Sequence, residues 1–448
     1  MSLSLIYFMP GLSKVKPVAG AALIVIAVPT VVFSWSMSSV AAETTVGLSA
    51  FAALLVGVLL LRRRPSDVRK CAGLDAASAA KLNPRRRRLF KCLSLSIGCV
   101  TALVVLEAGL RIFQPFRFRL SGDQIELPAN QLYRFTNERL PGLDATVIQR
   151  RNSLGLRGPD PPADFQRALT VIAVGGSTTE CAFLSDGDDW PAVALDRLKS
   201  KFPDIWINNA GLDGHSTYGH RILLKDHLLA IAPKVMLFLL GINEVGRKDL
   251  RDSETNKPTH RTLLMRLANV SATVNLLVNF CRNRAAVNRE VAHSELRLAE
   301  RPLCDPADDD VEALLADHRV RFIPAYEARL RGLIADCFNY DIVPVLITQS
   351  ALYGHGTDDV SRVDLGRVAS QRGLSGASAW ALLEAYNDVT RNLGEELDIP
   401  VIDLAAEMPK SSRFYYDFTH YNIEGGKWVG EFVASKLAPI LSNRFAGE

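Results

Sequence analysis

Long apolar stretches dominate the first part of the chain. No charged residue lies between Lys16 and Glu43, and none lies between Glu43 and Arg62. A third apolar stretch, with few charges in it, extends to Phe113. A helix of about 20 apolar residues is long enough to cross the hydrocarbon layer of a bilayer. The pattern therefore predicts about three transmembrane helices, over residues 17–42, 44–61 and 90–113.

Basic residues in the segment 62–91 predict how these helices are oriented. The segment carries a net charge of +9, and short basic loops stay in the cytoplasm. Three crossings then place everything after Phe113 on the periplasmic or extracellular side of the inner (cytoplasmic) membrane. Two alternatives stay open, because the first apolar stretch also fits a signal peptide cleaved near Ala41 and the third also fits a buried helix.

The pattern changes after the apolar stretches. Residues 114–168 mix aromatic residues, prolines and glycines without helical spacing, which predicts an irregular or β-rich lead-in. From residue 169 onward, short apolar segments alternate with longer segments of helical spacing. The expected strands are 169–174, 205–209, 235–240, 342–348 and 400–403. The expected helices are 190–201, 219–231, 310–338, 376–397 and 424–439.

This alternation predicts an α/β domain over residues 169–448. Each expected strand is apolar on both faces, as in a parallel sheet that helices cover on both sides. About a hundred residues separate the third expected strand from the fourth, where a short crossover is usual. Residues 247–300 in this gap have helical spacing, so we expect a helical insertion that acts as a lid or substrate wall. A packing role, or contact with the membrane surface, is the alternative.

Charge and motif content narrow the possible partners. The whole chain carries a net charge of +4, whereas residues 92–448 carry −6. A mildly acidic exported domain is not expected to bind nucleic acid. The sequence contains no HExxH motif, no paired CxxC motif and no carboxylate cluster at ligand spacing. We therefore expect neither a metal nor a cofactor.

The part of the chain expected outside the cytoplasm contains four cysteines, Cys181, Cys281, Cys304 and Cys337. An oxidising compartment permits disulfides, and four cysteines allow three pairings. We favour a bond between Cys304 and Cys337, because Cys181 is expected to pack beside the turn after the first strand. Free buried thiols are the alternative.

Polar residues follow the expected strands, where α/β proteins usually carry reactive groups. Gly175–Thr178 follows the first strand, Asn209–Gly214 the second and Gly241–Glu244 the third. Asp417–His420 stands just before the last helix. Because loops at the carboxyl ends of parallel strands converge on one crevice, we expect these four segments to meet there.

The side chains in these segments suit acyl transfer. Ser177 provides a hydroxyl nucleophile, and His420 provides a base that titrates near neutrality. Asp417 is placed to accept a hydrogen bond from the other ring nitrogen and so fix the tautomer. The backbone N–H groups of Ser177 and Gly214, with the amide of Asn243, would form an oxyanion hole. Taken alone, Ser177 also fits the N-cap of a helix.

The four segments resemble the motif blocks of the SGNH, or GDSL-like, hydrolases. The resemblance covers about residues 169–440 and implies a flavodoxin-like doubly wound parallel sheet. It also implies the catalytic and oxyanion roles just given to the five residues. Two positions depart from the family pattern, because Gly176 replaces the Asp of the family name and Glu244 replaces the usual Asp. Neither position supplies the nucleophile, an oxyanion donor or the base.

The resemblance and the expected location together imply a membrane-anchored serine esterase. We expect it to act on ester groups, above all O-acetyl groups, of envelope or exported glycans, with lipid esters as the second substrate class. An O-acyltransferase of exopolysaccharide and a non-catalytic glycan-binding membrane component are the alternatives. Gln349, Tyr353 and His215 are the expected substrate contacts, and protein partners are left open.

Overall fold

The computed structural model describes most of the chain beyond residue 83. The described residues are 84–113, 118, 120–122, 124–138, 140, 142–247, 263–288, 293–370 and 373–445. The expected helices 17–42 and 44–61, with most of the basic segment 62–91, lie outside these residues. The chain forms two compact units, Met1–Arg117 with Val270–Leu277 and Phe118–Asn269 with Val278–Glu448.

The first unit contains one long apolar helix. Helix α5 (Pro84–Phe113) begins before residue 90, where the sequence pattern places its start. Its part Cys92–Phe113 has a mean hydropathy of 2.0 and buries none of its residues inside the protein. By length and composition, this helix can cross a membrane, and it is the one such helix among the described residues.

A charged residue near the end of α5 has partners within the same unit. Glu107 accepts hydrogen bonds from the backbone N–H groups of Ala272 and Thr273, both at 2.9 Å. These residues begin helix α11 (Ala272–Asn288). The first N–H groups of a helix have no partner inside it, so a carboxylate at this position satisfies them and favours the helix dipole.

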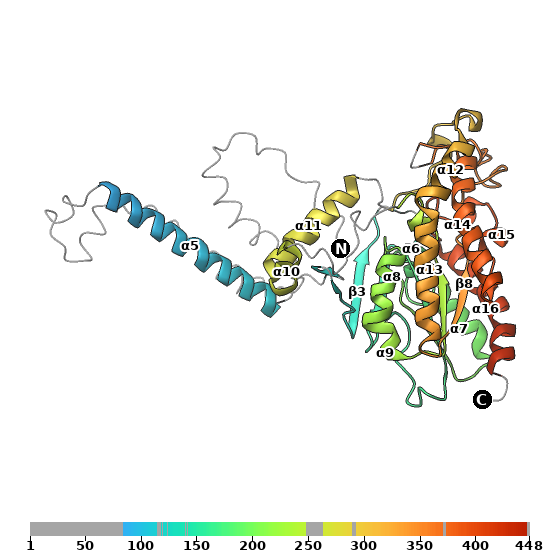
Figure 1. Cartoon of the computed structure of the whole chain (residues 1–448), viewed down its shortest axis with the longest axis horizontal. Coiled ribbons are helices and arrows are strands. Elements are labelled where there is room, and N and C mark those ends of the chain that lie inside the picture. Colours follow the sequence, from blue (N-terminus) through green and yellow to red (C-terminus); the bar gives the residue numbers. More distant parts are fainter. Residues whose placement is uncertain are drawn as a thin grey trace. The chain divides into compact units, whose positions relative to one another are not determined.

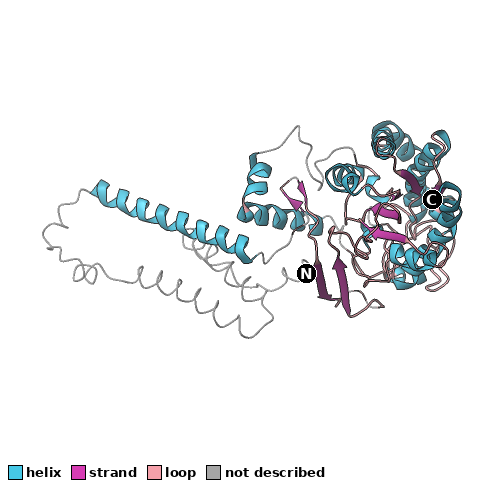
Figure 2. Ribbon diagram, turned by 90° about the horizontal axis from the view of Figure 1, so that it is seen from below, coloured by secondary structure: helices cyan, strands magenta, loops and turns pink. Residues whose placement is uncertain are grey.

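The second unit is built on a parallel sheet of five strands in the order β6-β5-β7-β8-β9 (Figures 1 and 2). The strands are β5 (Leu169–Gly175), β6 (Ile205–Asn209), β7 (Val235–Leu239), β8 (Val343–Ile347) and β9 (Val401–Ile402). Nearly all of their residues are buried. The strand order reverses at β5, so the loops after β5, β6 and β7 open into one crevice. The expected doubly wound α/β fold is confirmed.

Helices cover both faces of this sheet (Figure 1). Helix α7 (Trp190–Lys199) packs against α16 (Ile423–Phe445). Helix α13 (Ile323–Phe338) packs between α8 (Thr217–Leu223) and α14 (Gly376–Glu396) and contacts both. The described residues of the unit also form α6 (Ser177–Glu180), α9 (Leu229–Ile231), α10 (Leu263–Val270), α12 (Val311–Arg321), α15 (Leu404–Glu407) and the part of α11 from Val278 onward.

Two expected helices are interrupted in the structure. The expected helix 310–338 is divided into α12 and α13, because Pro324 stands at the start of α13 and cannot donate the N–H that would continue α12. The expected helix 219–231 is divided by a π-helical turn, Leu224–Leu228, between α8 and α9. Sequence spacing predicted where these helices lie but not where each is broken.

The lead-in forms two antiparallel hairpins, as its β-rich composition suggests. Strand β1 (Leu120–Ser121) pairs with β2 (Gln124–Ile125), and β3 (Gln131–Thr136) pairs with β4 (Thr146–Arg151) (Figure 2). After β4, Arg157 forms a bridge with Asn209 of β6, so this segment extends the sheet edge.

Arg157 fixes the lead-in to the α/β domain. It is only 2% exposed. Its Nε lies 3.1 Å from Asp186 and 3.2 Å from Asp189. The guanidinium also donates to the backbone carbonyl oxygens of Glu180 at 3.0 Å and Leu184 at 2.8 Å. Because a buried charge needs partners to be stable, these contacts indicate that the Arg157 guanidinium has a structural role in the core.

The expected disulfide between Cys304 and Cys337 is wrong, because both thiols are free. Cys337 lies on the buried face of α13, with its Sγ 3.9 Å from Met236 Sδ in β7. Its environment is therefore the apolar side of the sheet. Cys181 and Cys281 are free as well.

We predict that Arg157→Met lowers the free energy of unfolding by about 3–5 kcal/mol, because it leaves the buried Asp189 without its cation. Urea denaturation of the purified protein measures the change. Arg197→Met is the matched control, since Arg197 forms an exposed ion pair with Glu431. An equal, small effect of both substitutions would contradict the role given to Arg157.

Candidate active site

Ser177, His420 and Asp417 form one row of hydrogen bonds. The distance from His420 Nε2 to Ser177 Oγ is 2.7 Å, and that from His420 Nδ1 to Asp417 Oδ2 is 2.6 Å. Ser177 is the first residue of α6, two positions after the end of β5, and is 6% exposed. The N-cap position belongs to Gly176, so Ser177 is not itself the helix cap. The structure thus brings together three residues that the sequence places far apart.

The backbone around Asp417 holds its carboxylate in the charged form. Its Oδ1 accepts hydrogen bonds from the N–H groups of Thr419 and His420, both at 2.8 Å. Burial opposes ionisation of this carboxyl. Attraction to His420, the hydrogen bonds from His420 and Thr419, and attraction to His293 outweigh burial and lower the Asp417 pKa below its ordinary 3.8. A charged Asp417 can hold one tautomer of His420 in place.

The segments after β5, β6 and β7 also meet beside Ser177. Asn243 lies in a short 3-10 turn, Ile242–Glu244, and its Nδ2 donates to the carbonyl oxygen of His215 at 2.9 Å. A Cβ on Gly176 would lie 2.5 Å from that Nδ2. A Cβ at position 176 would therefore displace the Asn243 amide from its present position, which accounts for glycine at the first departure from the family pattern.

Gly214 completes the set of expected donors. Its φ of +72° is a backbone conformation that residues with a Cβ rarely adopt. A Cβ at this position would meet no atom within 4 Å, so the backbone angle is the reason for glycine. The N–H of Gly214 therefore belongs to a turn whose shape is fixed by local backbone geometry.

The second departure from the family pattern, Glu244, forms a buried ion pair. Its Oε2 lies 2.8 Å from Arg329 of α13, and its Oε1 accepts from the N–H of Thr217 at 2.5 Å. Thr217 begins α8, so Glu244 joins the third motif segment to two helices. The longer Glu side chain is thus used to fix the turn that carries Asn243.

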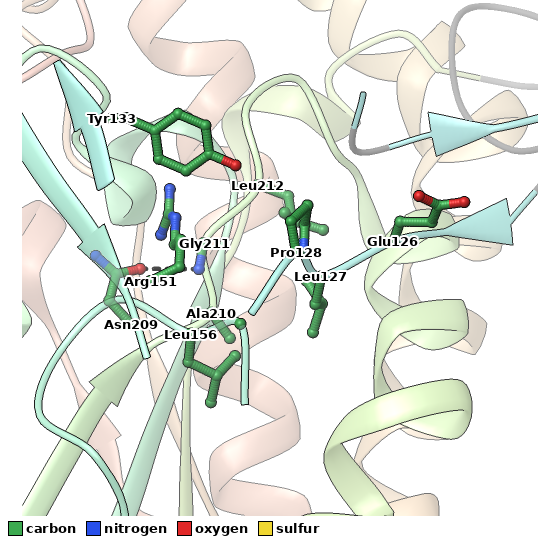
Figure 3. A pocket seen from close by; sticks show the side chains of 11 residues that line it. Glu126, Leu127, Pro128, Tyr133, Arg151, Leu156, Asn209, Ala210, Gly211 and Leu212 are labelled. Carbon is green, nitrogen blue, oxygen red and sulfur yellow. Dashed lines mark hydrogen bonds between the residues drawn. The ribbon is translucent and has the colours of Figure 1, made fainter. Parts of the chain in front are cut away.

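A second buried carboxylate, that of Glu180, contacts the second motif segment in a similar way. Glu180 accepts from Arg151 at 3.2 Å and from the N–H of Asp213 at 2.6 Å. Arg151, at the end of β4, also lines a small cavity with Tyr133 and the segment Asn209–Leu212 (Figure 3). The lead-in hairpin therefore contacts the loop that carries Gly214.

The three residues expected to contact substrate are all buried. Gln349 accepts a hydrogen bond from Thr178 Oγ1 at 3.2 Å. The ring of Tyr353 stacks on that of Phe418, with centroids 4.8 Å apart. The backbone carbonyl oxygen of His215 accepts a hydrogen bond from the side-chain amide of Asn243. These contacts support the loops of the site, and direct contact with substrate stays a prediction for all three.

The structure adds His293 and Tyr416 to the site, which the sequence pattern did not indicate. The His293 ring centroid lies 4.1 Å from that of His420, and the Tyr416 ring stacks on His420 at 5.5 Å. His293, Asp417 and His420 have ligand atoms within 4.8 Å of one another, a spacing that suits a metal ion. Both ring nitrogens of His420 already contact Ser177 and Asp417, so a metal bound there would displace these contacts.

A serine, a histidine and an aspartate in one row, beside amide donors, form the arrangement of a serine ester hydrolase. Residues 173–428 match the model of the GDSL-like Lipase/Acylhydrolase family. Because this match spans more than half of the chain, the protein belongs to that family. The expected family and enzyme class are confirmed.

Three solved structures are among those similar to the chain. The acetyl xylan esterase AlAXEase is 15% identical, over 59% of this chain and 98% of its own, with a TM-score of 0.34. Axe2, an acetylxylan esterase from Geobacillus stearothermophilus, is 14% identical over 60% and 93%, with a TM-score of 0.35. LAE5, an alpha/beta hydrolase enzyme from the metagenome of Lake Arreo, is 15% identical over 60% and 95%, with a TM-score of 0.34. No curated protein sequence matches the chain.

We predict that Asp417→Asn destabilises the protein near neutral pH and that the difference becomes smaller in acid. Because folding lowers the Asp417 pKa, its contribution to stability is complete above the unfolded pKa and is lost as pH falls through the folded pKa. The free energy of unfolding of both proteins at about pH 7 and about pH 3 measures this. Asp226→Asn, at an exposed position, corrects for general effects of acid. A difference that stays constant between the two pH values would contradict the prediction.

Proposed function

We propose that this protein is a serine esterase in which Ser177 is the nucleophile, His420 the general base and Asp417 the residue that orients His420. The observation that carries the proposal is the continuous row of short contacts from Ser177 Oγ through His420 to Asp417. His420 takes the proton of Ser177 as its Oγ attacks the ester carbonyl carbon. His420 then gives this proton to the leaving alcohol, and an acyl-enzyme remains.

The negative charge on the carbonyl oxygen needs donors that are already in place. We assign this role to the N–H groups of Ser177 and Gly214 and to the Nδ2 group of Asn243. One hydrogen of Nδ2 is directed to His215, which leaves the other for the oxyanion. Water, activated by His420, then attacks the acyl-enzyme, releases the acid and restores the Ser177 hydroxyl.

We propose that α5 anchors the protein in the inner membrane and that the hydrolase domain faces the periplasm or cell exterior. The apolar length of α5 and the net charge of +9 on residues 62–91 support this orientation. Esters on that side of the membrane include O-acetyl groups of envelope and exported glycans, which we propose as substrates ahead of lipid esters. Transfer of the acyl group to a sugar hydroxyl instead of water is the alternative outcome, and product analysis with an acetylated glycan and an acceptor sugar tests it.

We predict that Ser177→Ala abolishes release of p-nitrophenol from its acetate ester and abolishes labelling by a fluorophosphonate probe. The alanine variant cannot form the acyl-enzyme, but it retains the small volume of the side chain. Ser435→Ala, on the exposed side of α16, is the matched control and should leave both signals unchanged. Equal hydrolysis by the Ser177→Ala variant and the parent would refute the proposed nucleophile.

We predict that Gly176→Ala lowers kcat by about a hundredfold, because its Cβ would displace the Asn243 amide. Asn243→Ala should give a similar loss. If both substitutions remove the same donor, the double variant should be little worse than either single variant. Losses that multiply in the double variant would show that Gly176 acts through another contact.

A further inference from the structure

His293 reaches the active site from the segment between β7 and β8. Its side chain is 5% exposed, and its ring lies 5.0 Å from the ring of Phe183 and 4.1 Å from that of His420. Tyr416 completes this cluster, with its ring 5.8 Å from that of His293. A histidine beside the base is therefore packed on several sides, although the reaction steps above give it no role.

Both ring nitrogens of His293 have polar partners on the motif loops. Nδ1 lies 2.6 Å from the Tyr416 hydroxyl, and Nε2 lies 3.4 Å from Asp213 Oδ2, the distance of an ion pair rather than a close hydrogen bond. Tyr416 directly precedes Asp417, and Asp213 directly precedes Gly214. His293 thus connects the loop of the base to the loop of an oxyanion donor.

The backbone next to His293 strengthens one of these connections. The N–H of Leu296 donates to the carbonyl oxygen of Tyr416 at 2.8 Å, and the N–H of Tyr416 donates to the carbonyl oxygen of His420 at 3.0 Å. The segment that carries His293 is therefore joined by hydrogen bonds to the loop that carries the base. Its position and that of His420 depend on each other.

The charges around His293 favour its protonated form. Burial lowers the His293 pKa, but contact with Asp213 and the charges of Asp213, Asp417 and Glu180 raise it above its ordinary value. Burial and the charges of Asp417 and Asp213 raise the Tyr416 pKa well above its ordinary value, so its hydroxyl keeps its proton. A protonated imidazole donates from both nitrogens, and each nitrogen of His293 has an oxygen partner, the Tyr416 hydroxyl at Nδ1 and the Asp213 carboxylate at Nε2.

We propose that His293 is a positioning residue, a clasp that holds the Asp213–Gly214 loop and the Tyr416–His420 loop at the separation that catalysis needs. The inference rests on the proposed function, because it assigns His293 to the same site. A small shift between the base and the oxyanion donors affects the transition state more than the bound ester. Loss of the clasp should therefore lower kcat and leave KM nearly unchanged.

Three substitutions separate the two contacts of His293. Phe keeps an aromatic ring but has no polar group, Asn keeps a polar group near the Nδ1 position that meets Tyr416, and Gln keeps one near the Nε2 position that meets Asp213. We expect His293→Phe to lower kcat for p-nitrophenyl acetate by at least about tenfold with KM within about twofold. Asn and Gln should each restore part of the loss.

Further variants keep the test decisive if His293→Phe does not fold. Tyr416→Phe removes only the hydroxyl, and Asp213→Asn removes only the negative charge, and each should lower kcat with little change in KM. His227→Phe is the matched control, because a ring nitrogen of His227 also has an oxygen partner, the backbone carbonyl of Ile125, away from the site. Folding of each variant is checked by thermal denaturation.

The outcomes distinguish this inference from the proposed function. A parent protein that neither hydrolyses the ester nor reacts with the fluorophosphonate would overturn both. An active parent whose kcat is unchanged by His293→Phe and by Tyr416→Phe would overturn the clasp alone. A rise in KM at constant kcat would assign His293 to substrate binding and would also refute a positioning role.

Discussion

The contact between Ser177 Oγ and His420 Nε2 is the interaction on which the site depends. It joins residues that are 243 positions apart, so no local structure can produce it. The buried strand β5 ends at Gly175 and places Ser177 at the carboxyl edge of the sheet, while α16 begins just after His420. A shift of β5 by one residue would turn its side chains to the opposite faces and separate the two atoms.

The two departures from the family pattern are explained by the neighbours that they contact. Gly176 leaves space for the Asn243 amide, where even a Cβ would be too close. Glu244 reaches Arg329 in α13, and a buried ion pair of this kind holds the turn that carries Asn243. Each change is therefore compatible with the same set of donors, arranged by contacts particular to this chain.

Segments outside the four motif segments also contact the loops of the site. The lead-in contributes Arg151, which pairs with Glu180 under the loop of Gly214, and the segment before α12 contributes His293 beside His420. Three carboxylates, those of Glu180, Asp213 and Asp417, lie near this end of the site. Arg151 pairs with the buried Glu180, and, although burial lowers the pKa of His293, the charges of Asp213, Asp417 and Glu180 raise it.

The sequence by itself determined the five strands, most of the helices, the apolar helix α5 and the four motif segments that contain Ser177 and His420. These features depend on local patterns of apolar residues and on the rule that parallel strands direct their following loops to one edge. Tertiary structure alone decided that Cys337 packs against Met236 without a disulfide, that Glu244 pairs with Arg329, and that His293 lies beside His420. Such contacts join segments far apart in the chain, and the spacing of residues along a sequence does not fix the distance between their side chains in space.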